Sequence, residues 1–259
     1  MIETISKETF KRINKLNNKK YRDDSSDAFD VLIEGERLIS QIIDYGIVIK
    51  SIYCRDDKYS QYRDLTKKAN SSVYLLTEKQ SAQLSETENE QGIYAQIAFK
   101  TKAITKYNRL FYLNAVSDPG NLGNIFRTAS AFGVDGLILD EQCCDLSNSK
   151  VIRASLGAVF AVPVMRVDDN WLFTRKEEIY ACVSSSDGCE AVSINDFQEQ
   201  ESPSLFIIGS EAHGVSKNIL NLAKKQIYIP MCGEMESLNV SVAFGLFAHK
   251  IMMGGDNDG

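Results

Sequence analysis

The 259-residue sequence has little histidine, no Cys-x-x-Cys pair and no long apolar run. Its two histidines, His213 and His249, are far apart, and zinc sites usually need paired cysteines and histidines, so we predict no metal site. A membrane span needs about 18 uninterrupted apolar residues, and none occur. The N-terminus also lacks the charged start and apolar block of a secretory signal. These absences predict a cytoplasmic protein with reduced thiols and no membrane partner.

Charge is distributed unevenly along the chain. The net charge of −6 argues against indiscriminate binding to nucleic acid. Residues 1–22 nevertheless hold seven basic and two acidic residues, and residues 100–109 add four basic residues and no acid. These two clusters are either phosphate-contacting surfaces or an ordinary solvated helix face and charged linker, and charge alone does not separate the two interpretations.

Hydrophobic patterns divide the chain into two α/β halves. In residues 1–99 short amphipathic helical patterns, such as 36–45, alternate with extended runs. The basic segment 100–109 is predicted to be a linker. In residues 110–259 strands alternate with helices more regularly, which predicts a mostly parallel sheet covered on both faces. Ligands of such sheets bind at the carboxyl ends of the strands.

In the second half, helical and extended patterns are expected at ten places. Helices are expected at 121–132, 150–160, 215–223 and 238–252. Strands are expected at 109–116, 136–139, 162–167, 179–184, 205–209 and 227–229.

Three separated stretches of this half, 118–128, 207–214 and 229–241, have the composition of functional loops. Each puts glycine, proline or asparagine beside an apolar run, as at the end of a strand or helix. A single glycine, Gly209, lies between the strand at 205–209 and the following loop, and its missing side chain would let a ligand approach the backbone. Because the Gly-x-Gly-x-x-Gly phosphate fingerprint is absent, an NAD-binding protein is disfavoured.

The polar residues of these stretches each have a structural and a functional interpretation. Asn121 is either a helix N-cap or a site residue. Arg127, in an otherwise apolar helix, extends to solvent, forms an ion pair or lies in a polar pocket. Glu211 either orients a bound group or is an exposed acid near a helix start. Ser237 is suited to cap the last helix, and Asn239 is expected in its first turn. Asparagine competes there for backbone hydrogen bonds, which suggests a role other than helix formation.

The three stretches resemble, in order and at suitable spacing, the signature motifs of the SpoU (TrmH-like) family of RNA ribose 2′-O-methyltransferases, in the SPOUT superfamily. The first half resembles, less specifically, the L30e-like substrate-binding domain that many members carry, through residues 32–38 and 91–93. The resemblance implies a small L30e-like α/β domain at 1–99, a linker at 100–109 and a SPOUT α/β domain at 110–259. It also implies a C-terminal trefoil knot, which composition and periodicity do not suggest.

The resemblance further implies a cofactor, S-adenosyl-L-methionine, and a homodimer. The cofactor-binding positions it implies are Gly209, Ile229, Met231 and Leu238. The catalytic positions it implies are Asn121, Arg127, Glu211, Ser237 and Asn239.

The expected activity is 2′-O-methylation of a ribose in structured RNA. The L30e-like first half favours ribosomal RNA, of the large subunit, over tRNA as the substrate. DNA is excluded as a substrate because it lacks the 2′-hydroxyl. Residues 101–259 hold 13 basic and 19 acidic residues, so RNA is expected to be held mainly by the first half and the linker. A tRNA methyltransferase and a non-catalytic RNA-binding protein are the alternatives.

Overall fold

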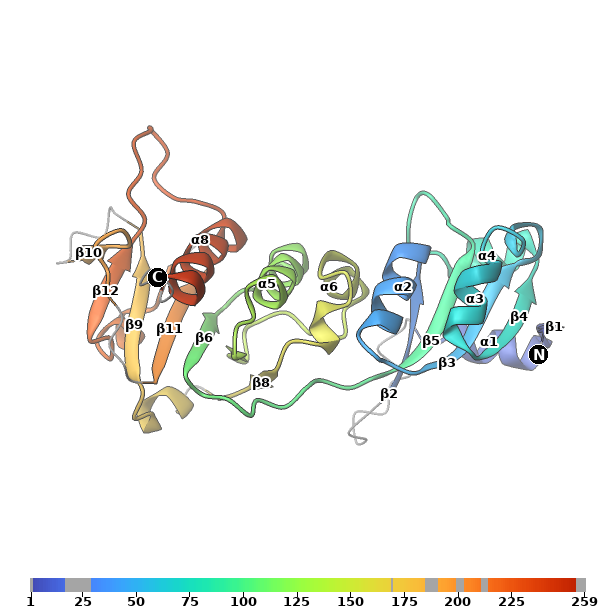
Figure 1. The fold of residues 1–259 in the computed structure, drawn as a ribbon, viewed down its shortest axis with the longest axis horizontal. Helices are drawn as coiled ribbons and strands as arrows, with labels where there is room; N and C mark the ends of the chain where they lie inside the picture. Colours follow the sequence, from blue (N-terminus) through green and yellow to red (C-terminus); the bar gives the residue numbers. More distant parts are fainter. Residues whose placement is uncertain are drawn as a thin grey trace, which may run out of the picture. The chain divides into compact units, whose positions relative to one another are not determined.

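The protein's computed structural model describes residues 2–16, 29–168, 170–184, 191–198, 203–210 and 214–254. The chain forms two compact units, Met1–Lys100 and Thr101–Gly259, which are described separately (Figure 1). Among the described residues, no helix combines the length and the apolar character needed to cross a membrane.

The first unit is a five-stranded mixed sheet with helices packed on it. The strand order is β1-β4-β3-β5-β2, and β5 runs antiparallel to both β2 and β3. The strands are β1 (Ile2–Thr4), β2 (Phe29–Glu34), β3 (Ile49–Arg55), β4 (Ser72–Leu76) and β5 (Ile93–Phe99). The helices are α1 (Lys7–Ile13), α2 (Glu36–Asp44), α3 (Arg63–Ala69) and α4 (Glu78–Leu84), with a 3-10 turn, η2, at Asp56–Lys58.

Residues 32–38 and 91–93, the two stretches through which this unit resembles the L30e-like domain, are in contact. Gly35 takes a positive φ of 108° between β2 and α2, a conformation that favours glycine. The backbone N–H of Glu36 donates to Oε1 of Gln91 at 3.1 Å, and the N–H of Gln91 donates to Oε1 of Glu34 at 3.3 Å. Ser85 Oγ also donates to the Glu34 carboxylate at 3.0 Å. The polar loop before β5 is therefore fixed against the β2–α2 turn.

The second unit is built on a seven-stranded parallel sheet with the order β10-β12-β9-β11-β6-β7-β8. The strands are β6 (Arg109–Asn114), β7 (Gly136–Leu139), β8 (Val164–Arg166), β9 (Glu178–Val183), β10 (Ala191–Ser193), β11 (Ser204–Gly209) and β12 (Lys225–Tyr228). The helices are α5 (Pro119–Phe132), α6 (Ser149–Ala154), α7 (Lys217–Leu220) and α8 (Val240–Met253), with 3-10 turns η3 (Ala158–Phe160) and η4 (Trp171–Thr174). The mostly parallel α/β architecture is confirmed, and the trefoil knot stays a prediction.

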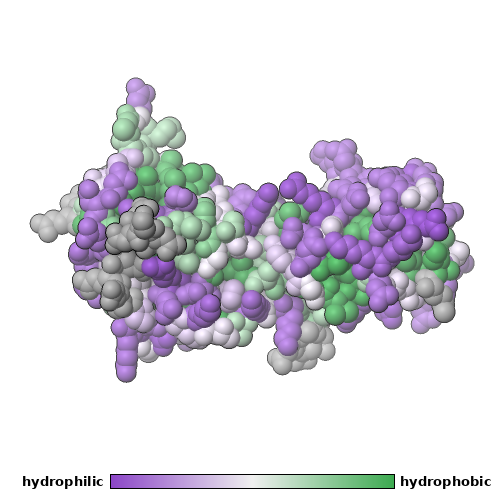
Figure 2. All heavy atoms as spheres, in the orientation of Figure 1, coloured by the Kyte–Doolittle hydropathy of each residue, from purple (hydrophilic) through white to green (hydrophobic). Residues whose placement is uncertain are grey.

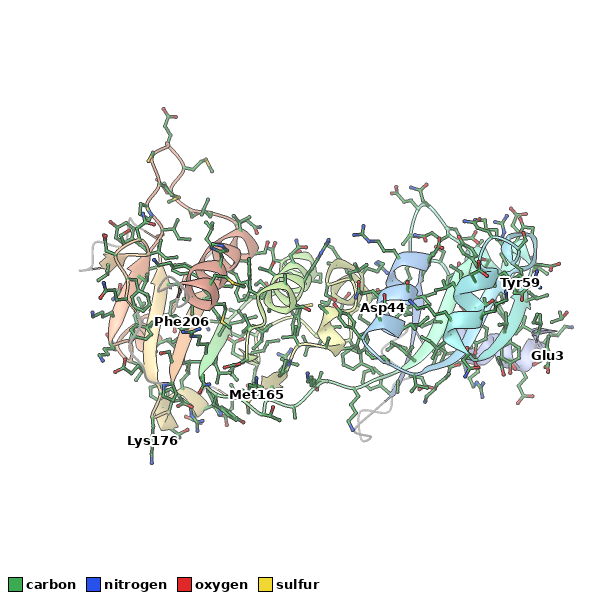
Figure 3. The ribbon with its side chains drawn as sticks, in the orientation of Figure 1. Glu3, Asp44, Tyr59, Met165, Lys176 and Phe206 are labelled. Carbon is green, nitrogen blue, oxygen red and sulfur yellow. The ribbon has the colours of Figure 1, made fainter. Side chains whose placement is uncertain are left out.

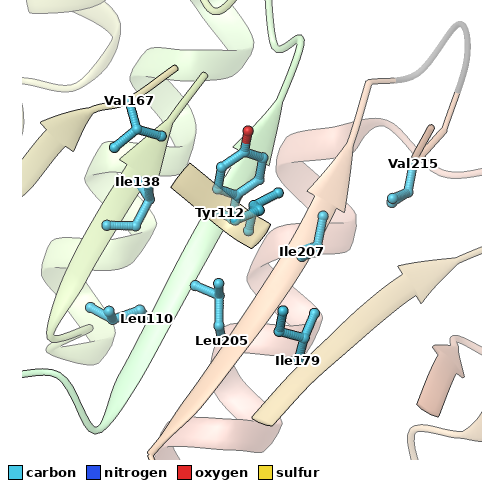
Figure 4. Packing of buried hydrophobic residues seen from close by; sticks show 9 residues of the cluster. Leu110, Tyr112, Ile138, Val167, Ile179, Leu205, Ile207 and Val215 are labelled. Atoms are coloured by element: carbon cyan, nitrogen blue, oxygen red, sulfur yellow. The ribbon is translucent and has the colours of Figure 1, made fainter. Parts of the chain in front are cut away.

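Both faces of this sheet are buried. On one face, the ring of Phe111 lies 5.4 Å from that of Phe206 and 4.9 Å from that of Phe244 on α8. Phe206 is therefore interior, whereas Lys176, before β9, points away from the sheet (Figure 3). The opposite face carries an aliphatic cluster built around Tyr112 (Figure 4). The fully or nearly buried members of this cluster are Leu110, Tyr112, Ile138, Val167, Leu172, Ile179, Leu205, Ile207 and Val215.

The basic segment before β6 lies against the second unit. The N–H of Val164 donates to the carbonyl of Lys102 at 2.9 Å. Ile104 packs against Gly136, where a Cβ would lie 2.8 Å from the Ile104 side chain. The side chains of Lys102 and Lys106 are exposed. The segment therefore presents basic side chains to solvent while its backbone is hydrogen-bonded to the second unit.

Several expected helices of the second half are shorter than predicted. The helix expected at 150–160 ends at Ala154, because Leu156 (φ 50°) and Gly157 (φ 78°) adopt the left-handed conformation. The helix expected at 215–223 is reduced to α7. The strand β10 was not predicted, since its three residues carry no clear alternation.

Candidate active site

A cavity of about 830 Å³ lies where β9, β11 and β12 end at the carboxyl edge of the parallel sheet. This edge contains the topological switch point, because β6 continues to β7 and β8 on one side while β11, β9 and β12 lie on the other. The cavity is lined by residues of the second and third signature stretches. They include Gly209, Ile229, Met231, Ser237 and Leu238.

Position 209 must be glycine because the chain at Gly214 and Val215 lies where a side chain would be. A Cβ at this position would lie 2.1 Å from the carbonyl carbon of Gly214 and 2.3 Å from the N of Val215. The N–H of Gly214 donates to the carbonyl of Ser210 at 2.9 Å, which holds Gly214 beside the end of β11. Gly214 and Val215 make this close approach and line the cavity together with Gly209. The expected approach of a ligand to the Gly209 backbone stays a prediction.

The wall of the cavity is mainly apolar, with a few polar groups. Cys182 is buried at the end of β9, and burial raises the pKa of its thiol well above the ordinary value, so the thiol stays neutral. Ser216 and Gln226 also line the cavity. Apolar walls with a small number of placed polar groups are typical of sites for small organic ligands.

Asn121 is not the N-cap of α5. The cap is Asp118, whose Oδ1 accepts from the N–H of Asn121 at 2.8 Å, and Pro119 occupies the first helical position. Proline suits that position because its missing N–H would have no helical partner there. Asn121 therefore lies within the first turn, and its side chain does not cap the helix.

Asn239 is the N-cap of α8, a role that we predicted for Ser237. Its Oδ1 accepts from the N–H of Ser241 at 3.0 Å, and the helix begins one residue later. The expectation of Asn239 inside the first turn was therefore wrong, because asparagine stabilises this helix by capping it. Its other side-chain atom, Nδ2, donates to Oδ1 of Asn121 at 3.0 Å. This bond brings the first and third stretches together. Ser237 is exposed and lines the cavity.

Arg127 lies six residues beyond Asn121 on α5, and its side chain is exposed. Among the described residues, no hydrogen bond or ion pair holds its guanidinium group, so the structural ion pair that we considered is not found within that part of the chain. The guanidinium is accessible to a ligand from solvent. Glu211, together with His213, lies outside the described residues. His249 is exposed and packs edge-on against Phe132, consistent with a surface role.

A buried polar network below the cavity was not predicted from the sequence. Asp140, fully buried after β7, accepts from Nδ2 of Asn114 and from the N–H of Ala115, both at 2.8 Å. Oδ1 of Asn114 accepts in turn from the N–H of Ser216 at 3.3 Å. The network therefore joins the ends of β6 and β7 to the cavity wall. The available signal was the placement of both polar residues directly after apolar strand runs.

The fold and the cavity define an α/β protein with two units and a cavity at the carboxyl edge of a parallel sheet. The chain belongs to the SpoU rRNA methylase family, whose model matches residues 108–249. A model of the MRM3-like substrate binding domain matches residues 7–95. The resemblance of both halves is thereby confirmed.

Relatives and solved structures agree with this assignment. The 23S rRNA (guanosine(2553)-2′-O)-methyltransferase RlmP of Bacillus subtilis is 30% identical over 96% of this chain and 98% of that protein. A protein of Staphylococcus saprophyticus assigned to the TrmH family of tRNA/rRNA methyltransferases is 32% identical over 86% and 95%. The AdoMet-bound rRNA methyltransferase of Sinorhizobium meliloti is 25% identical, covers 98% of each chain and has a TM-score of 0.77. The SpoU methyltransferase AviRb of Streptomyces viridochromogenes has the same fold, with 21% identity, coverage of 97% and 99%, and a TM-score of 0.79.

Proposed function

We propose that this protein uses S-adenosyl-L-methionine to methylate a ribose 2′-hydroxyl in large-subunit ribosomal RNA. The observation that supports this most strongly is that the second and third signature stretches line one cavity, while the first stretch is bonded to the third through Asn121 and Asn239. The Bacillus subtilis relative, which aligns over almost the full length of both chains, carries that activity in its name. A tRNA substrate is less favoured, because this relative acts on ribosomal RNA.

The cavity suits the cofactor in size and chemistry. Its volume of about 830 Å³ is within the usual range for small organic ligands. Gly209, Ile229, Met231 and Leu238 would hold the cofactor, and its purine would contact apolar wall. Ser216, an exposed residue of the same wall, supplies a polar group there. When bound, S-adenosyl-L-methionine supplies a methyl group already activated by the sulfonium.

The protein must then align the acceptor oxygen and help the hydroxyl to lose its proton. Alignment of reacting groups contributes up to roughly 7–11 kcal/mol, and assistance to proton removal about 10²–10⁴-fold. We assign Arg127 to the ribose hydroxyl and an adjacent phosphate, where its positive charge lowers the cost of the forming alkoxide. A guanidinium group stays protonated in proteins, so Arg127 stabilises the forming negative charge, and the hydroxyl proton passes to solvent water.

Asn121, Asn239, Ser237 and Glu211 are assigned to positioning. The bond between Asn121 and Asn239 fixes the start of α5, which carries Arg127, relative to the start of α8. Ser237 is exposed at the cavity, where it would contact the nucleotide or the cofactor. Glu211 would hold Arg127 or the ribose.

We assign RNA binding mainly to the first unit and to the basic segment before β6. Lys7, Lys11 and Lys15 are exposed at four-residue spacing in and just beyond α1, which places them on one face. In the segment before β6, Lys106 is exposed beside Tyr107, whose ring is 44% exposed. Basic side chains beside an exposed aromatic ring can contact a phosphate backbone and stack on a base.

We further propose that the protein is a homodimer that associates through α8. Val242, Leu246 and Met253 are exposed apolar residues spaced so that they share one side of this helix. Figure 2 shows hydrophobic atoms gathered over α8. A second copy would remove this surface from water.

The decisive experiment supplies radiolabelled S-adenosyl-L-methionine with unmodified large-subunit ribosomal RNA, tRNA and a matching oligodeoxynucleotide. Label is expected in ribosomal RNA alone, at a linkage that resists alkali because its 2′-oxygen is methylated. Label found only in tRNA would show that the substrate is tRNA and not ribosomal RNA. Cofactor binding with no transfer to any RNA would favour a non-catalytic RNA-binding protein, and DNA methylation would contradict ribose chemistry.

A further inference from the structure

The helix α5 lies between two other helices of the second unit. It packs against α8 on one side and against α6 on the other (Figure 1). The contact with α6 is closest at Gly123, where a Cβ would lie 2.5 Å from Cβ of Ala154 and 2.9 Å from the carbonyl oxygen of Val151. Any larger residue at this position would push the two helices apart. Glycine therefore allows the first turn of α6 to lie beside the first turn of α5.

Lys150, in the first turn of α6, reaches the start of α5. Its Cε lies 3.7 Å from the place that a Cβ on Gly120 would occupy, so its aliphatic stem lies against Gly120. Its ammonium group lies 3.7 Å from Oδ2 of Asp118, the N-cap of α5. Asn148 caps α6 by accepting from the N–H of Lys150 at 2.9 Å, which fixes the backbone that carries this side chain. A positive charge is thereby held beside the first signature stretch.

The ion pair between Lys150 and Asp118 is not a strong structural contact. Its distance of 3.7 Å is longer than a hydrogen bond, and the two side chains are 58% and 52% exposed. Exposed pairs of this kind usually contribute little to the free energy of unfolding. An ammonium group also has three donors, so Lys150 can bind a further acceptor that approaches from solvent.

We infer that Lys150 binds a phosphate of the RNA backbone next to the target nucleotide and is thus a substrate-binding residue supplied by α6. This inference rests on the proposed function, which places the acceptor ribose near Asn121 and Arg127 on α5. Each nucleotide beside the target brings a negative phosphate toward this helix. Residues 101–259 hold 13 basic and 19 acidic residues, so most of this unit would repel that phosphate. Lys150 supplies a cation at the start of the helix that carries Asn121 and Arg127.

Asp118 gives the inference a sign that can be tested. Its carboxylate caps α5 by accepting from the N–H of Asn121, and it also puts a negative charge where the phosphate would approach. If Lys150 served only to hold Asp118, removing either charge would have the same effect on RNA binding. If Lys150 binds phosphate, removing its charge weakens RNA binding, whereas removing the charge of Asp118 strengthens it.

The test measures binding of unmodified large-subunit ribosomal RNA to the full-length protein at several salt concentrations, by filter retention. Lys150→Met keeps the aliphatic stem and removes the charge, so affinity at low salt should fall by about tenfold. The slope of log affinity against log salt should become shallower by about 0.7–0.9, the value for one lost phosphate contact. Lys150→Arg should restore both quantities. In methyl transfer, Lys150→Met should raise KM for RNA and leave kcat within about twofold.

Asp118→Asn completes the test, because asparagine is also a good N-cap but carries no charge. It should tighten RNA binding by about two- to threefold. The control is Lys224→Met, which removes another exposed lysine of the second unit that pairs with a carboxylate, that of Glu178, at the amino edge of the sheet. Its affinity and its salt slope should stay at the wild-type values.

An unchanged slope in Lys150→Met, an equal change in Lys224→Met, or weaker RNA binding in Asp118→Asn would overturn the inference. A wild-type protein that transfers no methyl group to any RNA would instead overturn the proposed function. Circular dichroism would establish that each variant is folded.

Discussion

Asn239 donates a hydrogen bond from Nδ2 to Oδ1 of Asn121 at 3.0 Å, joining residues 118 positions apart. The same side chain caps α8 through its Oδ1, which accepts from the N–H of Ser241. The N–H of Asn121 bonds in turn to Asp118, the cap of α5. The starts of two helices are thus joined through one pair of amides, and a change at Asn239 has two separable effects, on helix capping and on the position of α5.

Serine at position 239 separates these effects. Serine is a good N-cap but its side chain is too short to reach Asn121, so Asn239→Ser should change the free energy of unfolding by less than about 0.5 kcal/mol. Asn239→Ala should lose about 1 kcal/mol, because the cap is lost as well. Both variants should slow single-turnover methyl transfer by about tenfold or more, since both release the start of α5. Urea unfolding and quench-flow transfer would measure the two quantities. Normal transfer in Asn239→Ser would show that the bond to Asn121 does not serve catalysis.

Arg127 offers a test of charge stabilisation, because its exposed side chain makes no ion pair with the described residues. Arg127→Ala should therefore alter the free energy of unfolding by less than about 0.5 kcal/mol. Turnover should fall by about 10²–10³-fold, the usual cost of removing one group that stabilises a developing negative charge. Cofactor affinity, measured by calorimetry, should stay within about threefold.

Arg37→Ala is the control for Arg127→Ala, because it removes another exposed arginine, from α2 in the first unit. Its turnover should fall much less. If Arg127→Ala instead lost cofactor affinity but kept normal turnover, Arg127 would have to be assigned to cofactor binding and not to the RNA substrate.

The sequence predicted the sheet of the second unit better than its helices. The apolar runs that form β6, β7 and β11 are short, buried on both faces and bounded by turn residues, so their pattern is unambiguous. The apolar pattern of the helix expected at 150–160 continues through Leu156. The helix ends earlier because Leu156 adopts a left-handed backbone conformation. The local hydrophobic pattern of a sequence does not show which residue will adopt a left-handed conformation, because tertiary packing selects that conformation.

The site was predictable as a set of loops but not as a set of contacts. Loop composition identified Asn121 and Asn239, yet their bond depends on how α5 and α8 pack. The bond between Asn114 and Asp140 likewise depends on β6 lying beside β7 in the sheet. Contacts of this kind are set by strand register, which one sequence does not give.

Asp140 should be the most sensitive polar position below the site. Its side-chain oxygens accept four hydrogen bonds, from Nδ2 of Asn114 and from the N–H groups of Ala115, Gln142 and Cys143. Asp140→Ala removes the side-chain acceptor of these buried and part-buried donors and should lower the free energy of unfolding by on the order of 3 kcal/mol. The single tryptophan, in the second unit, would report its unfolding in urea.

Asp135→Ala is the control for this substitution, since a half-buried Asp135 accepts from the N–H of Arg109. It should cost about 1 kcal/mol. An Asp140→Ala protein as stable as Asp135→Ala would mean that water or a rearranged loop satisfies the four donors.

The proposed dimer depends on the exposed apolar side of α8. Val242 is 52% exposed, and a charge at this position would have to be buried when a second copy covers the helix. Val242→Asp should therefore convert a dimer into a monomer, or weaken the dimer at least about 100-fold, as measured by sedimentation velocity. Val48→Asp, which alters a 78% exposed residue of the first unit, should leave the dimer unchanged. A wild-type protein that sediments as a monomer at micromolar concentration would contradict the proposal.

Alkaline pH should destabilise the second unit through its buried thiols. Burial, with a smaller contribution from nearby Asp140, raises the pKa of Cys143 to about 12. The same thiol has a pKa of about 8.5 in an unfolded chain. Between these values the unfolded chain has lost a proton that the folded protein keeps, so the free energy of unfolding falls as pH rises, by up to about 1.4 kcal/mol per pH unit for this thiol. Below about pH 8 this thiol contributes no pH dependence.

Cys143→Ala should therefore flatten the dependence of stability on pH between about 8.5 and 10.5, whatever its effect on stability at neutral pH. The exposed Cys232 gives the control, because Cys232→Ala removes a thiol that is already in water. Tryptophan-monitored urea unfolding at several pH values would give the slopes. Equal slopes in wild type and Cys143→Ala would mean that the Cys143 thiol ionises without unfolding, for example because water reaches the end of β7, and the closed network around Asp140 would then have to open in the native state.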